Sequence, residues 1–390
     1  MKGRKRLESV NKIIYKISSY NIRQAQQKRM DNIMKSVSFE KMISAKPINK
    51  DILFVMPTIY PHSGGETSIL RLSTFLANNG YNVFYSCYDN NNIEEMEKNC
   101  RINFKDYKGT FLKMSECENR SFDFVISTFW IAAYRAKRIK GYHIYFAQDF
   151  EPYFYPLDEN YVLAKKVYSM GFHIISLGLW NKEEIIKHTS TKDRIDVIDF
   201  PYEPSEYKPI QRDYMMYSGK KNIKLAVYIK NDGKRLPNLI QYNLKCAADE
   251  LLKSYGIKLD VNIFGMNIKE KLLVGNNIGR LSKEQLMQLY CECDFGMVAS
   301  MTNISLVPYE MLATGLPLIE FKDGSYETFL GNDTAALVSF DYKDIVNEIV
   351  SSINNPSILL ERHNYSVKKL SKLSWLKTAE QFKSIIDSCY

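Results

Sequence analysis

The sequence predicts an α/β protein with two doubly wound, Rossmann-like domains. At 390 residues the chain is long enough for two domains, each with its own core. Short apolar segments alternate with amphipathic segments of helical period, which is the pattern of parallel strands and crossover helices. A connection rich in proline separates the two sets of segments. We expect an arm over residues 1–48, domains over 49–205 and 206–365, and a closing helix over 366–390.

The arm carries the net charge of the chain. Residues 1–46 hold 12 Lys and Arg against 3 Asp and Glu, which accounts for the whole net charge of +9. Val10, Ile13, Ile14 and Ile17 form one apolar stripe of a predicted basic helix. Two interpretations stay open: the helix contacts an anionic membrane surface or a lipid-linked substrate, or it packs on the protein itself. Because the predicted domains carry no net charge, we expect no nucleic-acid partner.

Cysteine and histidine spacing gives no sign of a metal site. The seven cysteines include no CxxC pair, and the five histidines have no metal-ligand spacing. No D-x-D triplet and no apolar run long enough to span a membrane occurs. We therefore expect a cytoplasmic protein without metal, associated at most peripherally with the inner face of the membrane.

The first predicted domain opens with a buried strand over 51–57. The loop 58–67 follows and contains the pair Gly64-Gly65, then a helix over 69–79 and a strand over 81–85. Paired glycines let a ligand approach the backbone closely. The G-x-G-x-x-G fingerprint is missing, which argues against a nicotinamide dehydrogenase.

A polar and aromatic segment, residues 148–156, follows the predicted strand 142–147. It contains two carboxylates, Asp149 and Glu151, and four aromatic residues. Open α/β sheets place their sites where the strands end. Asp149 or Glu151 could therefore orient an acceptor hydroxyl, and the aromatic rings could stack on sugars. The alternative is a turn that caps the next helix.

A basic loop follows the first strand of the second predicted domain, residues 223–229. Lys230, Lys234 and Arg235 stand in this loop, and a guanidinium pairs well with a diphosphate. The alternative is a solvated turn. The strand 259–264 then ends at Gly265, and the segment 276–281 precedes a helix that begins at Ser282.

Residues 294–321 form the most informative stretch, with the pattern of strand, loop, helix and strand. Ser305 is a favourable N-cap, Pro308 fits the first helical turn, and Gly315 ends the helix. The helix N-terminus should face the crevice, where it can bind an anion. Glu310 stands about one turn into the helix and could accept hydrogen bonds from hydroxyls. A site for phosphate beside a site for hydroxyls indicates a nucleotide-sugar ligand. The alternative interpretation of Glu310 is a solvated helix carboxylate.

This stretch resembles the donor-site signature of GT-B glycosyltransferases of the family-4 type. The signature has two glutamates with seven residues between them; Glu310 matches the second, and Thr302 stands in place of the first. Ser305, Pro308, Glu310 and Met311 are more similar to the variant in WsaF-like rhamnosyltransferases, as is the run QDFEP at 148–152. The resemblance covers the chain from about residue 50 to its end.

The resemblance implies two domains that face each other across a cleft, with the closing helix crossing back to the first domain. It implies a retaining reaction that needs no metal or other cofactor. Asp149, Glu151 and Arg235 are its candidate catalytic residues. The implied donor-binding residues are Gly64, Gly65, Lys230, Lys234, Arg235, Gly265, Ile278, Leu281, Thr302, Asn303, Ile304, Ser305, Leu306 and Glu310.

The expected function is transfer of a sugar, with rhamnose as one candidate, from a nucleotide-diphosphate donor. The expected acceptor is a growing cell-surface polysaccharide or a lipid-linked glycan. Thr302 in place of glutamate implies either a deoxysugar or a loss of catalysis. The second possibility is therefore a non-catalytic GT-B subunit that binds glycan or stabilises a partner transferase. A nucleotide-sugar epimerase or a glycan phosphorylase also stays open.

Overall fold

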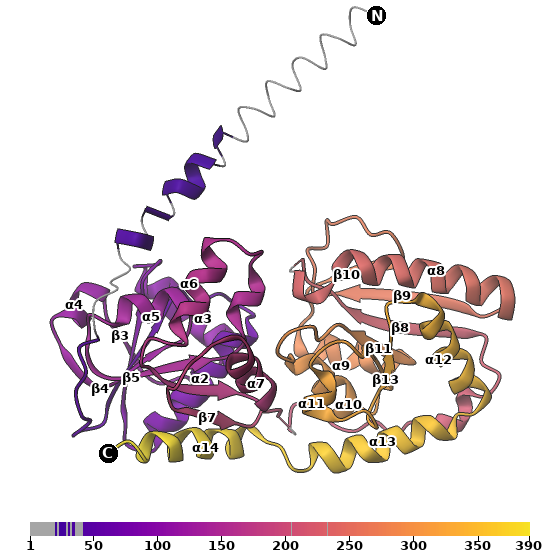
Figure 1. The fold of residues 1–390 in the computed structure, drawn as a ribbon. Helices are drawn as coiled ribbons and strands as arrows, with labels where there is room; N and C mark the ends of the chain where they lie inside the picture. The colour runs from indigo at the N-terminus through magenta and orange to yellow at the C-terminus, as the bar shows by residue number, and fades with distance from the viewer. Residues whose placement is uncertain are drawn as a thin grey trace, which may run out of the picture.

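The computed structural model describes residues 20–21, 23–28, 30–31, 33–35, 42–203, 205–231 and 233–390. In this part of the chain it shows two domains, each built on one parallel sheet with helices on both faces (Figure 1). The predicted apolar stripe of the arm, residues 10–17, lies outside the described residues.

The first sheet has seven strands within the described residues. Its order is β3-β2-β1-β4-β5-β6-β7, and every neighbouring pair is parallel. The strands are β1 (Asp51–Met56), β2 (Asn82–Cys87), β3 (Thr110–Phe111), β4 (Ser121–Ser127), β5 (Lys140–Ala147), β6 (His173–Leu177) and β7 (Ile195–Ile198). Their burial is almost continuous, as a sheet covered on both faces requires.

The second sheet has six strands in the described part of the chain, in the order β10-β9-β8-β11-β12-β13, again all parallel. They are β8 (Asn222–Tyr228), β9 (Lys258–Phe264), β10 (Asn276–Gly279), β11 (Phe295–Val298), β12 (Leu318–Phe321) and β13 (Ala336–Val338). The strand order reverses beside the first strand of each sheet, between β1 and β4 and between β8 and β11. Ligands of open α/β sheets bind at such switch points.

Helices connect successive strands in both domains. In the first domain they are α2 (Gly64–Asn78), α3 (Ile93–Asn103), α4 (Met114–Glu118), α5 (Trp130–Ala136), the 3-10 turn η1 (Glu151–Phe154), α6 (Glu159–Val167) and α7 (Leu179–His188). The second domain has η2 (Tyr214–Tyr217), η3 (Gly233–Arg235), α8 (Pro237–Tyr255), α9 (Lys283–Glu292), α10 (Leu306–Ala313), α11 (Tyr326–Leu330), α12 (Tyr342–Asn354) and α13 (Ser357–Leu370).

Helix α2 begins five residues earlier than the sequence pattern predicts. The pair Gly64-Gly65 forms its first turn rather than a loop. A Cβ atom added to Gly65 would make ordinary van der Waals contact with the amide of Gln148, at 3.6 Å. The N-terminus of α2 therefore lies next to the residue that follows β5.

The chain returns to the first domain in its last helix, α14 (Trp375–Asp387). Figure 1 shows α13 beneath the second domain and α14 beneath the first. The ring of Phe382 packs 5.5 Å from that of Phe146, and Thr378 Oγ1 donates a hydrogen bond to the Asp199 carbonyl. Packing of this kind ties the two domains together at a second place, apart from the connection after β7.

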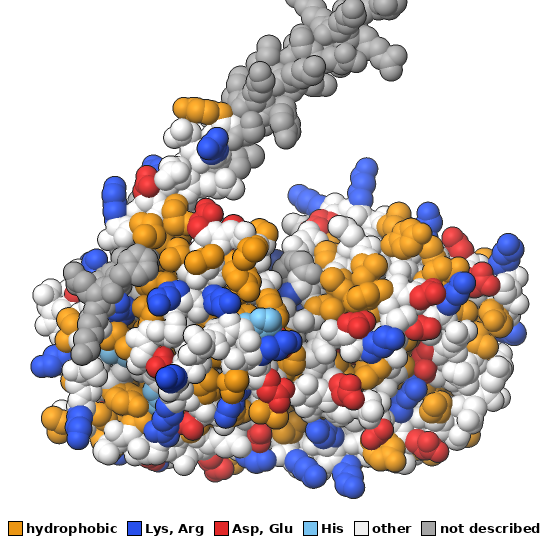
Figure 2. All heavy atoms as spheres, viewed as in Figure 1, with side chains coloured by type: hydrophobic (Ala, Val, Ile, Leu, Met, Phe, Trp, Pro, Cys, Tyr) orange, Lys and Arg blue, Asp and Glu red, His pale blue; other side chains and the backbone are white. Residues whose placement is uncertain are grey.

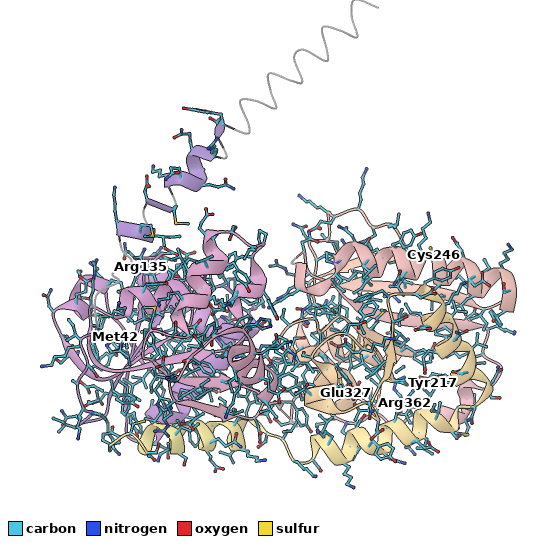
Figure 3. All side chains as sticks on the ribbon, viewed as in Figure 1. Met42, Arg135, Tyr217, Cys246, Glu327 and Arg362 are labelled. Atoms are coloured by element: carbon cyan, nitrogen blue, oxygen red, sulfur yellow. The ribbon has the colours of Figure 1, made fainter. Side chains whose placement is uncertain are left out.

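The described end of the arm lies against the first domain. Ala45 donates a backbone hydrogen bond to Gly141, and Ile33 is buried. Arg135 on α5, labelled in Figure 3, lines a cavity of about 450 Å³ together with Lys28 and Ile33. No helix in the described residues is both long enough and apolar enough to cross a membrane.

Candidate active site

A cavity of about 900 Å³ lies between the two domains. The loops at the carboxyl ends of both sheets line it, so the two switch points face one space. Figure 2 shows Lys and Arg interspersed with Asp and Glu over both domains on the face in view, without a single-sign patch.

The structure brings most of the sequence-predicted residues together around this cavity. From the first domain come Gly64, Gly65, Asp149 and Glu151. From the second domain come Lys230, Lys234, Arg235, Gly265, Leu281, Asn303, Ile304, Ser305, Leu306 and Glu310. Their exact roles toward a ligand stay predictions.

Two of the predicted donor-binding residues do not line the cavity. Ile278 on β10 packs against the apolar core instead. The side chain of Thr302 is buried, and its hydroxyl donates to Asp149 Oδ2 at 2.8 Å. The structure therefore does not place these two side chains at the cavity wall, and their contact with a donor stays a prediction. The sequence could not distinguish them from their neighbours, because their direction depends on contacts with distant segments.

Arg235 is the buried cation of the site. Its side chain is only 4% exposed, and Nη1 donates to the Ala299 carbonyl at 2.8 Å. Among the described residues no carboxylate forms an ion pair with it. Glu320 is nearby; burial raises the pKa of its carboxyl, while hydrogen bonds from Ser300 and the charge of Arg235 oppose that effect. Arg235 thus presents a buried positive charge beside the cavity without an ion pair in the described chain, with Lys230 and Lys234 in the same loop.

The N-terminus of α10 also faces the cavity, because Ser305 and Leu306 both line it. Ser305 has extended N-cap geometry, as predicted, but its side chain forms no capping hydrogen bond. Within the described residues its buried hydroxyl has no partner at all. The first N–H groups of the helix and this hydroxyl are therefore available to an anion or to a substrate oxygen.

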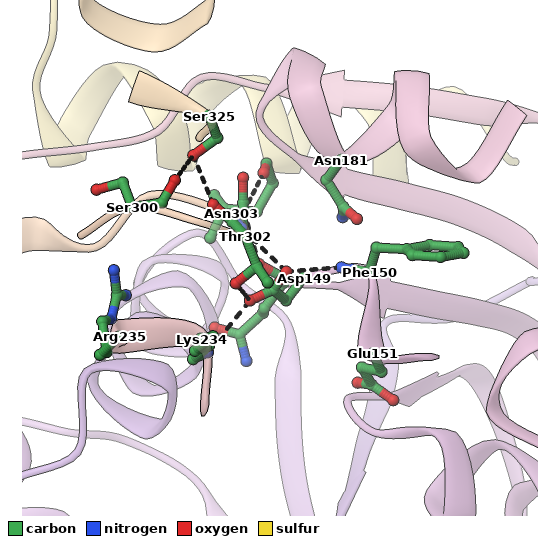
Figure 4. A network of polar contacts seen from close by, with 12 residues as sticks. Asp149, Phe150, Glu151, Asn181, Lys234, Arg235, Ser300, Thr302, Asn303 and Ser325 are labelled. Atoms are coloured by element: carbon green, nitrogen blue, oxygen red, sulfur yellow. Dashed lines mark hydrogen bonds and ion pairs between the residues drawn. The ribbon is translucent and has the colours of Figure 1, made fainter. Parts of the chain in front are cut away.

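Asp149 lies where the two domains meet (Figure 4). Its Oδ1 accepts hydrogen bonds from the backbone of Phe150 at 2.8 Å and of Asn303 at 3.0 Å. Its Oδ2 accepts from Thr302 Oγ1 at 2.8 Å and from Lys234 Nζ at 3.2 Å. Three of the four donors belong to the second domain, so this carboxylate links the domains.

Asn303 strengthens the same link. Its Nδ2 donates to the carbonyls of Gln148 at 2.7 Å and Leu177 at 2.8 Å, at the ends of β5 and β6. With Asp149, these bonds hold the loop between β11 and α10 against the first domain. The expected turn-capping alternative for the segment 148–156 does not describe Asp149, whose side-chain partners lie mostly across the cleft.

Glu151 is buried behind Asp149. Its Oε2 accepts a hydrogen bond from the Trp130 backbone at 2.8 Å, and burial raises the pKa of its carboxyl to about 8. A group that holds a proton near neutral pH can act in proton transfer. Its contacts also serve the fold, because it satisfies the N-terminal N–H of α5.

Glu310 lines the second-domain wall of the cavity. Burial raises the pKa of its carboxyl to about 7 from the ordinary 4.5, while the hydroxyl of Tyr207 opposes this effect. Burial and the nearby Glu310 in turn raise the pKa of Tyr207. Its partial burial and its contact with Tyr207 differ from what the alternative of a solvated helix carboxylate expects. Sequence reasoning missed Tyr207, which lies in the connection between the domains, and no local motif marks it.

The architecture matches solved glycosyltransferase structures. The sucrose-phosphate synthase of Thermosynechococcus elongatus is 12% identical over 87% of this chain and 99% of its own, with a TM-score of 0.65. HepE of Anabaena, in complex with UDP-glucose, is 11% identical over 87% and 99% of the two chains, with a TM-score of 0.66. S. aureus TarM, in complex with UDP and other ligands, is 9% identical over 85% and 99%, with a TM-score of 0.63.

The chain has the GT-B fold. Both parallel sheets and their helices correspond across nearly the whole length of these structures. At identities this low the likeness establishes the architecture and leaves the chemistry to the site. No protein-family model and no curated protein sequence matches the chain.

The raised pKa of Glu310 predicts how one substitution changes the pH dependence of stability. The folded state holds this proton more tightly than the unfolded state, so the group's stabilising contribution is lost as pH rises from 4.5 to about 7. Glu310→Gln is neutral at every pH. We expect it to match wild type near pH 5 and to exceed its free energy of unfolding by up to roughly 3 kcal/mol near pH 7.5.

Denaturant unfolding at the two pH values measures this difference. Glu327 on α11, labelled in Figure 3, is exposed and does not line the cavity, so Glu327→Gln is the matched control. A constant difference between Glu310→Gln and wild type at both pH values would contradict the burial of an ionisable Glu310.

Proposed function

We propose that the chain is a glycosyltransferase that moves a sugar from a nucleotide diphosphate to a glycan acceptor. The observation that carries this proposal is the interdomain cavity, in which Arg235 presents a buried charge without an ion-pair partner in the described chain. A buried cation of this kind is costly unless a ligand supplies the counter-charge. The GT-B architecture, shared with HepE in its complex with UDP-glucose, supports the choice of a nucleotide-sugar as that ligand.

The donor would bind the second-domain side of the cavity. Arg235, Lys230 and the N-terminus of α10 would bind the diphosphate, as cations and free N–H groups do. Glu310 would accept hydrogen bonds from ribose hydroxyls. Gly265 lines the same side of the cavity and would lie near the nucleoside.

The acceptor would bind the first-domain side. Asp149 and Glu151 lie at this wall, and we propose that they position the acceptor hydroxyl. The positive charge of Arg235 would stabilise the diphosphate as it leaves the sugar. We extend the proposal to retention of anomeric configuration and to catalysis without a metal, because protein cations at the cavity can serve the leaving group. Product NMR and an assay in EDTA test both points: an inverted product, or loss of activity in EDTA, would contradict them.

We propose rhamnose as the donor sugar and a lipid-linked cell-surface polysaccharide as the acceptor. No carboxylate stands at position 302 to bind sugar hydroxyls, which suits a deoxysugar. The arm's charge suits contact with an anionic membrane on the cytoplasmic side.

Binding to anionic vesicles tests the role of the arm. We expect the full chain to co-sediment with phosphatidylglycerol vesicles. We expect little binding when Lys2, Arg4, Lys5 and Arg6 are replaced by Gln, because each basic residue near the surface contributes about 1 kcal/mol. Equal binding of both proteins to the vesicles would contradict the proposed membrane contact of the arm.

A non-catalytic GT-B subunit is the second candidate. Thr302 favours it, since the family-4 signature is broken there. Such a protein would keep the fold and a glycan-binding surface without tight nucleotide binding. The next experiment separates the two.

Thermal unfolding with a nucleotide panel tests the proposed function. The probes are the uridine, thymidine and guanosine diphosphates and their sugars. A ligand at 100 times its dissociation constant stabilises the fold by about 2.7 kcal/mol. We expect one nucleotide to raise the unfolding temperature of wild type and of the control Glu327→Ala, but much less that of Glu310→Ala. No shift with any probe, on folded protein, would favour the non-catalytic subunit.

A further inference from the structure

The carboxylate of Asp149 has its hydrogen-bonding capacity filled in this structure. A carboxylate has about four lone-pair positions. Phe150 and Asn303 occupy those of Oδ1, and Thr302 and Lys234 occupy those of Oδ2 (Figure 4). Asp149 nevertheless lines the cavity. As it stands, it could accept nothing from a ligand.

Three of these four donors are fixed. Two are backbone N–H groups in folded segments, and Thr302 is a short side chain, 4% exposed. Lys234 differs, because its long side chain is 24% exposed and also lies 4.4 Å from the ring of Phe154. Lys234 is therefore the one donor to Asp149 that can leave without unfolding anything.

Lys234 also belongs to the anion site. It lines the cavity and precedes Arg235, the buried cation, in the turn η3. A diphosphate carries more negative charge than Asp149 and would attract the ammonium group away from it. The departure of Lys234 would leave one lone pair of Asp149 Oδ2 open toward the cavity.

The described residues that line the cavity include four acidic side chains: Glu66, Asp149, Glu151 and Glu310. Glu310 is the one from the second domain, and its carboxyl is next to Tyr207. Asp149 is the one that forms an ion pair with Lys234.

We propose that Asp149 is a specificity-determining residue that binds one hydroxyl of the donor sugar, after the diphosphate has drawn Lys234 away. This inference rests on the proposed function and changes one role in it: Asp149 binds the donor sugar, which leaves Glu151 to position the acceptor hydroxyl. It follows that Asp149 itself accepts one hydrogen bond from the sugar, and that this bond requires the two domains to be together.

The test compares the affinity for a nucleotide with that for its sugar. Isothermal titration calorimetry gives dissociation constants for UDP and UDP-glucose, dTDP and dTDP-rhamnose, and GDP and GDP-mannose. The ratio within each pair isolates the sugar's contribution. Asp149→Asn keeps an acceptor for the two backbone N–H groups but removes the charge from the side chain. We expect it to reduce the ratio about tenfold or more for the pair that wild type binds, with a smaller effect on the nucleotide alone.

Thr302→Val is the matched control. It removes one hydrogen bond between the domains and leaves the charge of Asp149 in place, so we expect the ratio to stay close to that of wild type. If both variants reduce the ratio equally, Asp149 acts only by holding the domains, and the inference is wrong. An unchanged ratio in Asp149→Asn also overturns it.

The failure of the proposed function has a different outcome. If folded wild type binds no member of the panel, the proposed function and this inference fall together. If Asp149→Asn does not fold, Lys234→Met provides the second variant. We expect Lys234→Met to weaken binding of the nucleoside diphosphate, since the ammonium group is lost. An unchanged affinity would show that Lys234 does not bind the diphosphate, and the proposal that Lys234 moves from Asp149 to the diphosphate would be wrong.

Discussion

A buried guanidinium without a carboxylate partner is the constraint that organises the site. The neighbouring buried carboxyl, Glu320, accepts two hydrogen bonds from Ser300 and forms no ion pair with Arg235 in the described chain. An isolated charge in such a place lowers stability unless something else supplies compensation. An anionic ligand would supply that compensation. It would also account for the cavity, for the lysines beside Arg235 and for the free N–H groups of α10.

The two domains depend on each other at this point. The order of each sheet reverses beside its first strand, which brings the functional loops of both domains to one cavity. Asp149 and Asn303 then bind across it, and α14 ties the domains together at their base. Lys234 lines the proposed anion site of the second domain and also forms the ion pair with Asp149 of the first domain. An anion that binds in the second domain would therefore change the contacts of the first.

Much of this fold could be predicted from the sequence. Apolar runs ending in polar loops located the central strands, and Ser282 and Gly315 were correctly placed at helix ends. The start of α2 was missed because a glycine pair is a weak helix former, so the local sequence favours a loop there. Ser305 was placed correctly at the N-cap, but the lack of a capping bond depends on side-chain direction, which local sequence does not determine.

The candidate site could be predicted only in part, because local sequence does not determine the direction of each side chain. Residues just after predicted strands, such as Asp149 and Lys230, could be assigned to one crevice from topology alone. The directions of Thr302 and Ile278 could not, because each depends on packing against segments far away in sequence. The partnership of Thr302 with Asp149 joins positions 153 residues apart, and nothing in either local motif indicates it.

The most direct measurement is calorimetric titration of Arg235→Met against wild type with the nucleoside diphosphate that wild type binds. Methionine keeps much of the apolar stem and removes the charge. If Arg235 binds the diphosphate, the variant should fold and lose roughly tenfold to a hundredfold in affinity, as expected for a charge-assisted hydrogen bond. The corresponding nucleoside should bind both proteins alike. Equal diphosphate affinities would contradict the account at its centre.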